Sequence, residues 1–245
     1  MRIAIVADVH GNLTAFEAVV TDIGRRAPDL VVQGGDLALM GPRPAEVIDR
    51  VRELGWPGVV GNTDELLWRP EGHERQRERA PQLAPLLSLL FGPFAADTSE
   101  RLGEERIEWL KALPTEHREG ELCLVHARPG DLWRAPMPEA TDDELHAAYD
   151  ELQARQVVFG HIHRQFARAV GGLTVANTGS VGMPWDGDPR AAYLLIDDGS
   201  PELIRVEYDV EAAIAALYAA GHPDADRLAA MRRSGRFITP APSGG

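Results

Sequence analysis

Strand and helix patterns alternate along the first quarter of the chain. Residues 3–7 form a continuous apolar run, which is typical of a strand covered on both faces. Apolar residues then recur at helical spacing from Leu13 to Ile23, and Pro28 ends this predicted helix. The same patterns predict further strands at 30–32 and 59–60 and a helix at 44–54. This order and spacing predict a parallel sheet with right-handed crossovers.

Residues 64–113 have a mainly helical pattern that prolines interrupt. A charged section, 71–79, precedes an apolar section, 83–91, and prolines stand at 81, 85 and 93. Because proline does not continue a helix, the segment is predicted to form several short helices. These are either a helical insertion over the functional site or peripheral helices, and we favour the insertion.

The second half of the chain is richer in short strands. Glu119-Gly120 is a hairpin-turn dipeptide between two strand-like runs, and a helix is predicted at about 142–154. Five further strands are predicted, at 157–159, 165–168, 173–176, 192–196 and 203–207. One or two closing helices are predicted at 209–233. Both halves together predict an α/β fold in which two sheets pack face to face between outer helices. We expect one domain over 1–235 and a disordered tail over 236–245.

Composition narrows the classes of partner. The chain has 245 residues, 44% of them hydrophobic, which is enough to bury a core without disulfides or a structural metal. Its net charge of −13 disfavours long nucleic acid, although bound cations would let it accept a small anionic substrate. Apolar runs are too short for a membrane span or a signal peptide, so we expect a soluble, cytoplasmic protein without a membrane partner. The single cysteine, Cys123, lies in an apolar run and is expected in the core.

Seven side chains with nitrogen or oxygen ligand atoms follow the predicted strands: Asp8, His10, Asp36, Asn62, His126, His161 and His163. Ligands bind at the carboxyl ends of strands in open parallel sheets, so these side chains are expected to converge on one edge. Each motif alone is weak, since a lone histidine is more often a surface residue than a ligand. The whole set in this order favours a metal centre. One divalent ion cannot use seven ligands, whereas two ions sharing a carboxylate can, and these donors suit manganese, iron or zinc.

The order of these motifs resembles that of a known family. Within residues 1–185 the chain carries, in turn, Asp8-Val9-His10, Gly35-Asp36, Gly61-Asn62-Thr63-Asp64, His126 and Gly160-His161-Ile162-His163. In these motifs it resembles the calcineurin-like metallophosphoesterase superfamily, and most closely the small bacterial and archaeal phosphodiesterases of that superfamily. Residues 177–182 and 186–190 look like their sequences too. The resemblance implies a four-layer αββα fold, a two-sheet β-sandwich flanked by helices.

The resemblance also implies two divalent metal ions, drawn from manganese, iron, zinc and nickel. It assigns Asp8, His10, Asp36 and His163 to one ion, and it assigns to the other Asp36, Asn62, His126 and His161. Asp36 would bridge the ions, and a hydroxide between them would attack phosphorus in line, with Asp36 and Asn62 as catalytic residues. The expected function is hydrolysis of a phosphodiester bond in a small phosphorylated substrate. The alternatives are a phosphomonoesterase, including a protein or dinucleoside-polyphosphate phosphatase, and a metal-binding scaffold without catalysis.

Thr63 departs from the better-known family pattern. Many members have a histidine after the motif asparagine, where it can protonate the leaving group, and the threonine hydroxyl cannot act as an acid near neutral pH. Several of the small phosphodiesterases also lack that histidine, so the departure indicates a subfamily. Asp64 and Asn177 are expected to support the ligand residues from behind, with a helix cap as the alternative role for Asp64.

Four further residues near the motifs are candidates to bind the substrate phosphate. Asn12 is placed at a helix start, where it could face phosphate or cap the helix. Arg128, Arg134 and Arg164 lie near the ligand motifs and could bind phosphate in a fork. Surface ion pairs are the alternative role for each arginine.

Overall fold

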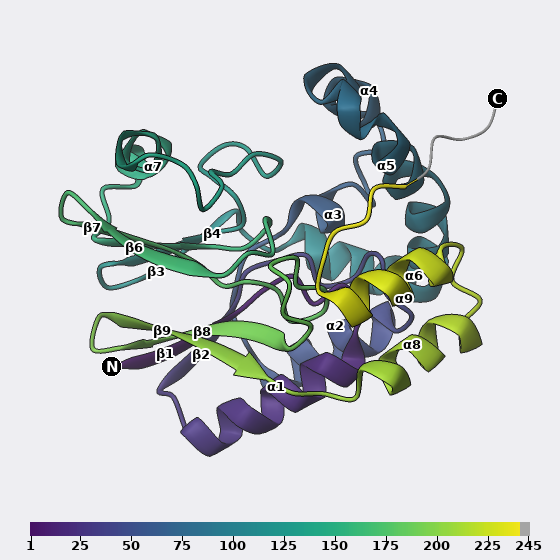
Figure 1. The fold of residues 1–245 in the computed structure, drawn as a ribbon, viewed down its shortest axis with the longest axis horizontal. Coiled ribbons are helices and arrows are strands. Elements are labelled where there is room, and N and C mark those ends of the chain that lie inside the picture. The colour runs from purple at the N-terminus through teal and green to yellow at the C-terminus, as the bar shows by residue number, and fades with distance from the viewer. Residues whose placement is uncertain (241–245) are drawn as a thin grey trace.

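Two β-sheets packed face to face, with helices on the outer face of each, make up the computed structural model, which describes residues 1–240 (Figure 1). The first sheet has the strand order β2-β1-β8-β9, formed by Leu30–Gln33, Arg2–Val6, Ala191–Asp197 and Ser200–Val206. The second has the order β3-β4-β5-β7-β6, formed by Glu116–Glu119, Leu122–Val125, Gln156–Phe159, Leu173–Asn177 and Phe166–Val170. This arrangement confirms the predicted two-sheet α/β fold.

Each sheet is parallel only in part. In the first sheet β1 is parallel to β2, as predicted, but β8 runs antiparallel to both β1 and β9. In the second sheet β4, β5 and β7 are parallel, whereas β3 and β6 pair in antiparallel fashion with their neighbours. Three of the antiparallel pairs, β3–β4, β6–β7 and β8–β9, are hairpins with glycine-containing turns, such as Asp198-Gly199 between β8 and β9. Strands β1 and β8 pair across most of the length of the chain.

Helices cover the outer faces and apolar side chains fill each layer. In Figure 1, α1 lies below the first sheet with α2 and α8 to the right of its strands, and α7 lies above the second sheet, with bounds Leu13–Arg26, Pro44–Leu54, Val210–Ala219 and Asp142–Tyr149. Along β1, Ala4 and Val6 pack in the cluster that includes α1, while Ile3 and Ile5 pack between the sheets. Strand β1 is therefore covered on both faces, and Cys123 is buried in the cluster with α7, both as predicted.

Residues 59–60, predicted as a third strand, form no strand. Gly58 makes only an isolated parallel bridge with Gln33 at the edge of the first sheet. Pro57 has no backbone N–H to donate, and α3 (Asn62–Glu65) begins shortly afterwards. The prediction was wrong because the chain passes the sheet edge with room for a single bridge.

The helical segment that follows β2 and precedes β3 in the chain consists of helices that extend beyond the strands (Figure 1). After α3 come α4, α5 and α6, with bounds Gly72–Arg79, Ala84–Leu89 and Ala95–Lys111. A 3-10 turn at Pro81–Leu83 and a π-helical turn containing Pro93 separate them, as the prolines predicted. No helix in the described part of the chain is long and apolar enough to span a membrane.

The last described residues pack against the protein. Helix α9 (Ala225–Ser234) precedes residues 236–240, which we expected to belong to a disordered tail. These residues are irregular but placed, and the ring of Phe237 packs edge-on against Trp185 with 5.0 Å between ring centroids. An aromatic side chain with a ring partner accounts for their order, and residues 241–245 lie outside the described part of the chain.

The loops after β7 and β1 are in close backbone contact at Gly182, where a side chain would clash. A Cβ atom at Gly182 would lie 1.9 Å from the carbonyl oxygen of Val9, whereas one at Gly24, in α1, meets nothing within 4 Å. Gly182→Ala should lower the free energy of unfolding by about 1–3 kcal/mol through this clash. Gly24→Ala should raise it by about 0.5–1 kcal/mol, because glycine is a poor helix former. Urea denaturation measures both, and equal effects would contradict the close packing of the loops.

Candidate metal centre

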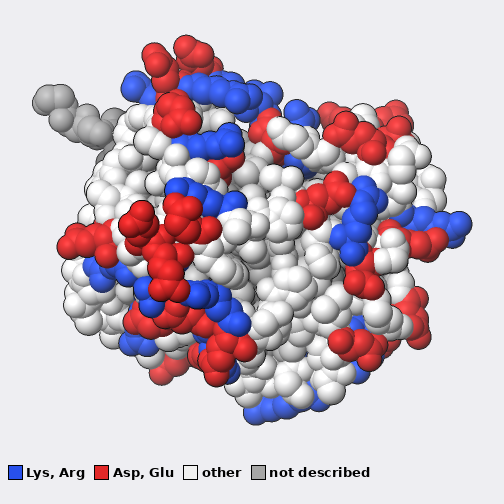
Figure 2. Space-filling view, turned by 180° about the vertical axis from the view of Figure 1, so that it is seen from behind, with Lys and Arg blue, Asp and Glu red and all other residues white. Residues whose placement is uncertain are grey.

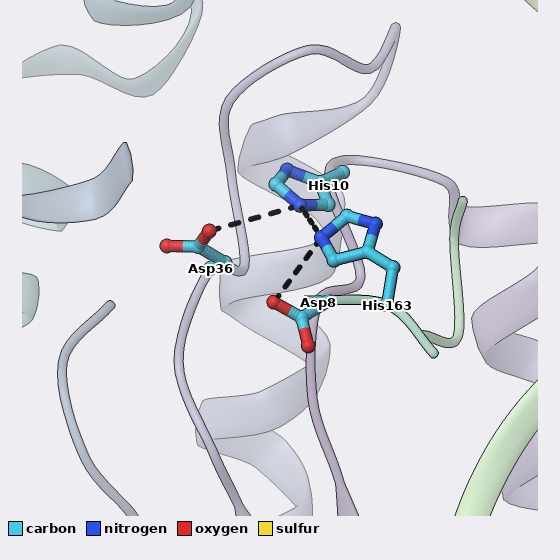
Figure 3. A group of neighbouring side chains, drawn as sticks. All are labelled: Asp8, His10, Asp36 and His163. Atoms are coloured by element: carbon cyan, nitrogen blue, oxygen red, sulfur yellow. Dashed lines mark hydrogen bonds and ion pairs between the residues drawn. The ribbon is translucent and has the colours of Figure 1, made fainter. Parts of the chain in front are cut away.

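All seven predicted ligand residues lie at one edge of the sandwich, where the strands end. They come from the loops after β1, β2, β4 and β5 and from the first residue of α3: Asp8, His10, Asp36, Asn62, His126, His161 and His163. Asp8, His10, Asp36 and His163 are buried, and each offers a ligand atom within 4.8 Å of the others' ligand atoms (Figure 3). The predicted convergence at the strand ends is therefore present in the fold.

The backbone at this edge is strained. Five of the seven residues have positive φ angles, namely 57° at Asp8, 49° at His10, 54° at Asp36, 67° at His161 and 55° at His163. This left-handed conformation costs about 1–2 kcal/mol for a typical residue, although Asp and His tolerate it better than most. Such strain persists where surrounding structure enforces it, and it concentrates at functional sites.

Two histidines direct ring nitrogens at each other. The Nδ1 atom of His10 lies 2.9 Å from the carbonyl oxygen of Leu39, and that of His163 lies 2.7 Å from the carbonyl oxygen of Met183. A carbonyl oxygen only accepts hydrogen bonds, so both Nδ1 atoms carry a proton, and in the neutral form of each ring the lone pair lies on Nε2. These Nε2 atoms are 3.1 Å apart, and Oδ1 of Asp8 is 3.4 Å from Nε2 of His163. Acceptors that converge in this way form a binding site for a cation.

Asn62 lies at the centre of a second group. Its Oδ1 atom is 2.9 Å from Nε2 of His126 and 2.8 Å from Nδ1 of His161. His126 donates through Nδ1 to the carbonyl oxygen of Gly34, at 2.8 Å, so its neutral ring has an acceptor at Nε2. A proton or a cation between that nitrogen and the amide oxygen allows this close approach.

Asp36 stands between the two groups. Its Oδ2 atom is 3.7 Å from Nε2 of His10, and its Oδ1 atom is 3.5 Å from Nε2 of His126. Oδ1 also accepts a hydrogen bond of 2.9 Å from the backbone N–H of Thr63. One carboxylate oxygen thus faces each group, which is the arrangement that a bridging ligand requires.

Burial sets the protonation of the site. It lowers the pKa of His10 to about 4, with His163 adding to the effect, and it lowers the pKa of His161 to about 4, with His126 adding. Both rings are therefore neutral at neutral pH, as metal ligands must be. Burial also lowers the pKa of His126, but Asp36 and other carboxylates outweigh it and raise that pKa above its ordinary value. A proton and a metal ion therefore compete for Nε2 of His126.

Asp64 and Asn177 hold the loops that carry the ligand residues. The Asp64 carboxylate accepts hydrogen bonds from the backbone N–H groups of Leu37 and Gly61, so it ties the loop after β2 to the start of α3. Asp64 is the third residue of α3, whose N-cap is Gly61, so the alternative role as N-cap of the next helix does not occur. Asn177 donates to the carbonyl oxygen of Gly160, directly before the His161 turn.

The four candidate phosphate-binding residues have different surroundings. Asn12 caps α1 and donates to the carbonyl oxygen of Gly182, so both of its polar atoms bond within the protein. Arg128 borders a neighbouring groove and does not line the cavity over the ligand residues. Arg134 and Arg164 do line that cavity, and Arg164 forms an ion pair with a glutamate. The arginines at the cavity are thus better placed to meet an anion than Asn12 or Arg128.

A cavity of about 450 Å³ opens over the ligand residues, with His10, Asp36, Asn62, His161 and His163 in its lining. Thr63 also lines it, and its Oγ1 atom is buried without a hydrogen-bond partner among the described residues. A bound group in the cavity can therefore reach the ligand residues.

Trp185 is a site residue that sequence analysis missed. Its ring stacks on that of His163, with 3.8 Å between ring centroids and 23° between the ring planes. Its backbone N–H donates to the carbonyl oxygen of His163 at 3.0 Å. Trp185 thus fixes the ring plane of a ligand residue. The only signal in the sequence is its position just after a motif typical of the small phosphodiesterases, and that signal does not predict the stacking.

Known proteins of similar sequence and structure are phosphoesterases or relatives of them. The family model for the calcineurin-like phosphoesterase superfamily domain matches residues 1–199. The crystal structure of a metallophosphoesterase from Sphaerobacter thermophilus is similar, with a TM-score of 0.75 and 28% sequence identity. That similarity covers 96% of this chain and 100% of the other.

Relatives found by sequence agree with the family model. An uncharacterized protein of Methanocaldococcus jannaschii is 28% identical over 234 residues, which cover 86% of this chain and 89% of the relative. A symmetrical bis(5'-nucleosyl)-tetraphosphatase of Methylococcus capsulatus is 32% identical over 151 residues, which cover 59% of this chain but only 49% of the relative. The family match spans most of the chain and includes every predicted ligand residue. The chain therefore belongs to the calcineurin-like phosphoesterase superfamily.

Proposed function

We propose that this protein is a phosphodiesterase that binds two divalent cations on either side of Asp36. The observation that carries the proposal is the meeting of two acceptor groups at one carboxylate, with His10 on one side and His126 on the other. Membership of a phosphoesterase superfamily and the buried cluster of aspartates and histidines support hydrolysis of a phosphate ester at this place.

The donor atoms fit divalent cations of the borderline class. Imidazole nitrogens and carboxylate oxygens form one half of the site, and Asn62 adds an amide oxygen to the other. Nε2 of His10 and Nε2 of His163 lie 3.1 Å apart, and the low pKa of His10 leaves its own Nε2 without a proton at neutral pH. A cation there removes the repulsion between the two lone pairs. Manganese, iron, zinc or nickel accepts this mixture of nitrogen and oxygen.

The residues of the chain fix the geometry in which phosphate would react. When bound, two cations supply positive charge to the phosphoryl oxygens and lower the pKa of water. The rings of His10 and His163 are held by hydrogen bonds to backbone carbonyls, so their free nitrogens stay aimed at the site. The Thr63 hydroxyl cannot protonate a leaving oxygen near neutral pH. The resemblance to small phosphodiesterases and a cavity roomy enough for a second ester group favour a diester.

A dinucleoside-polyphosphate phosphatase is the second candidate. The Methylococcus capsulatus relative is named as a symmetrical bis(5'-nucleosyl)-tetraphosphatase, and its match covers 59% of this chain. A nucleotide is a weakly basic leaving group that needs no proton donor, so Thr63 is compatible with this activity too. Side-by-side assays of bis(p-nitrophenyl) phosphate and diadenosine tetraphosphate decide between the two candidates.

Two other classes have less support. A scaffold without catalysis does not require all seven ligand residues, and here they keep the geometry of a metal centre. On the face shown in Figure 2, acidic and basic side chains are interleaved and form no continuous basic area. Together with the net charge of −13, this supports a small substrate rather than long nucleic acid.

The proposed activity should depend on bound metal. Protein stripped of metal should be inactive towards bis(p-nitrophenyl) phosphate and should regain activity with manganese, zinc or nickel. Asp36→Asn should lower kcat by more than about a hundredfold, because the neutral amide would hold more weakly the cations that stabilise charge on the reacting phosphate. Asp143→Asn, on the exposed side of α7, is the matched control and should keep full activity. Full activity of Asp36→Asn would overturn the bridging role.

Stability of the metal-free protein should depend on pH through His10. Its folded pKa is about 4 and its ordinary value is 6.5, so between these values the unfolded chain holds more protons. The free energy of unfolding should therefore fall by about 1.4 kcal/mol per pH unit from this group as the pH drops from 6.5 towards 4. Urea denaturation of metal-stripped wild type and His10→Gln measures this, since the glutamine does not titrate. Identical pH slopes for the two proteins would contradict a buried neutral His10.

The missing acid at Thr63 makes the rate depend on the leaving group. Diesters with an aryl leaving group should be cleaved at least about a hundredfold faster than those with an alkyl leaving group, because general acid catalysis contributes about 10²–10⁴ where it is present. Single-turnover kinetics with both substrates isolates the chemical step. Equal rates in that step would show that another residue delivers the proton.

A further inference from the structure

The cavity over the ligand residues has two chemically different sides. One side carries the ligand residues, including Asp36 and His163. The other is an apolar wall supplied by the helical segment and by the loop before α7, and its members are Leu83, Leu86, Leu87, Leu90 and Met137. Phosphate alone would need only the first side. The wall therefore offers an apolar surface to the part of a ligand that is not phosphate.

Exposed apolar side chains cluster at this wall. Among the described residues, six large hydrophobic side chains are exposed, and two of them, Leu83 at 36% and Met137 at 44%, line the cavity. The others include Leu203 on β9, at 43%, far along the chain from any ligand residue. Apolar side chains that face a site together, rather than singly on the surface, indicate a surface that another molecule covers.

Aromatic rings border the same cavity. Trp133 lines it and stacks on Phe91, with 5.5 Å between ring centroids and 14° between ring planes, and Phe91 in turn stacks on His73. Phe91 borders the neighbouring groove and not the cavity, so this series of stacked rings ends at the cavity with Trp133. Trp185 and Phe237, which pack on each other, also line the cavity. Rings in these positions favour a flat aromatic guest over a flexible aliphatic one.

The charged residues at the cavity favour an anion attached to that guest. Of the three arginines in the lining, Arg79 pairs with Asp131 and Arg164 pairs with Glu139. Arg134 is exposed at the cavity and forms no ion pair within residues 1–240. One cationic side chain is thus free to meet an anion that also reaches the ligand residues.

We infer that the cavity selects a small phosphate ester that carries an aromatic ring, with the phosphate at Asp36 and the ring between the apolar wall and Trp133. This inference rests on the proposed function and adds the class of substrate. A cavity of about 450 Å³ lies within the range of pockets that enclose small organic ligands. Nucleoside and aryl esters both fit this description, since each joins a planar ring to a phosphate group.

Isothermal titration of the manganese-loaded protein with phenylphosphonate and methylphosphonate tests the inference without turnover. Both ligands present the same phosphonate, so any difference comes from the ring. Phenylphosphonate should bind at least about tenfold more tightly, equivalent to about 1.4 kcal/mol. Equal dissociation constants would overturn the inference.

Variants at the wall separate its role from that of the metal ligands. Leu83→Ser and Met137→Ser should each weaken phenylphosphonate binding by about threefold or more and leave methylphosphonate unchanged, because only the ring touches the wall. Leu203→Ser is the matched control, with similar exposure outside the cavity, and should change neither constant. Loss of affinity for both ligands in the wall variants would indicate a structural role and contradict the inference.

Replacement of the ring addresses aromatic selectivity. Phenylphosphonate should bind better than cyclohexylphosphonate by about threefold or more, and Trp133→Leu should remove this preference. A stronger affinity for the cyclohexyl ligand would contradict an aromatic guest. The proposed function can fail while this inference holds. A protein that binds phenylphosphonate selectively but hydrolyses no ester with any metal would support the ring site and contradict the catalytic role.

Discussion

Two buried carboxylates without an arginine or lysine partner impose the main constraint on this structure. Within residues 1–240, the ion-pair contacts of Asp8 and Asp36 are with histidines alone, and their side chains are 0% and 3% exposed. An unpaired buried carboxylate costs several kcal/mol. His10 does not supply the missing positive charge, because its low pKa keeps the ring neutral. His126 can supply one charge by holding a proton, since Asp36 and other carboxylates raise its pKa. In the function that we propose, bound cations would replace that proton and balance both carboxylates.

The sandwich provides the positions that this chemistry needs. Asp8 connects loops from both sheets. Its N–H donates to the carbonyl oxygen of Gly35, and its carbonyl oxygen accepts from Ser180 and Gly182. Its carboxylate accepts from the N–H of His161. The strained φ angles at the ligand residues are maintained by such contacts. A shift of one sheet against the other would move Asp8 relative to His161. The packing of the two sheets therefore determines the geometry of the metal centre.

The ligand residues could be predicted because each polar motif follows an apolar run, and the ends of neighbouring strands meet in space. Asp36 could be assigned as the shared carboxylate only through the family resemblance, and its position between two groups appears only in the fold. Local patterns failed where the environment decides: residues 59–60 look like a strand but pass the sheet edge with a single bridge at Gly58. Trp133 and the apolar wall could not be predicted, because the sequence does not show which face of a short helix, or which side chain of a loop, turns towards a site built from other segments of the chain.

Titration of the metal-free protein with Mn²⁺, followed by electron paramagnetic resonance, tests most directly whether Asp36 bridges two cations. A shared carboxylate holds two Mn²⁺ ions close enough for their spins to couple. Wild type should bind two ions per chain and give an exchange-coupled spectrum once both are bound. Asp36→Asn should lose the coupling. Saturation at one ion per chain, or two ions with the spectrum of isolated Mn²⁺, would contradict the bridged centre.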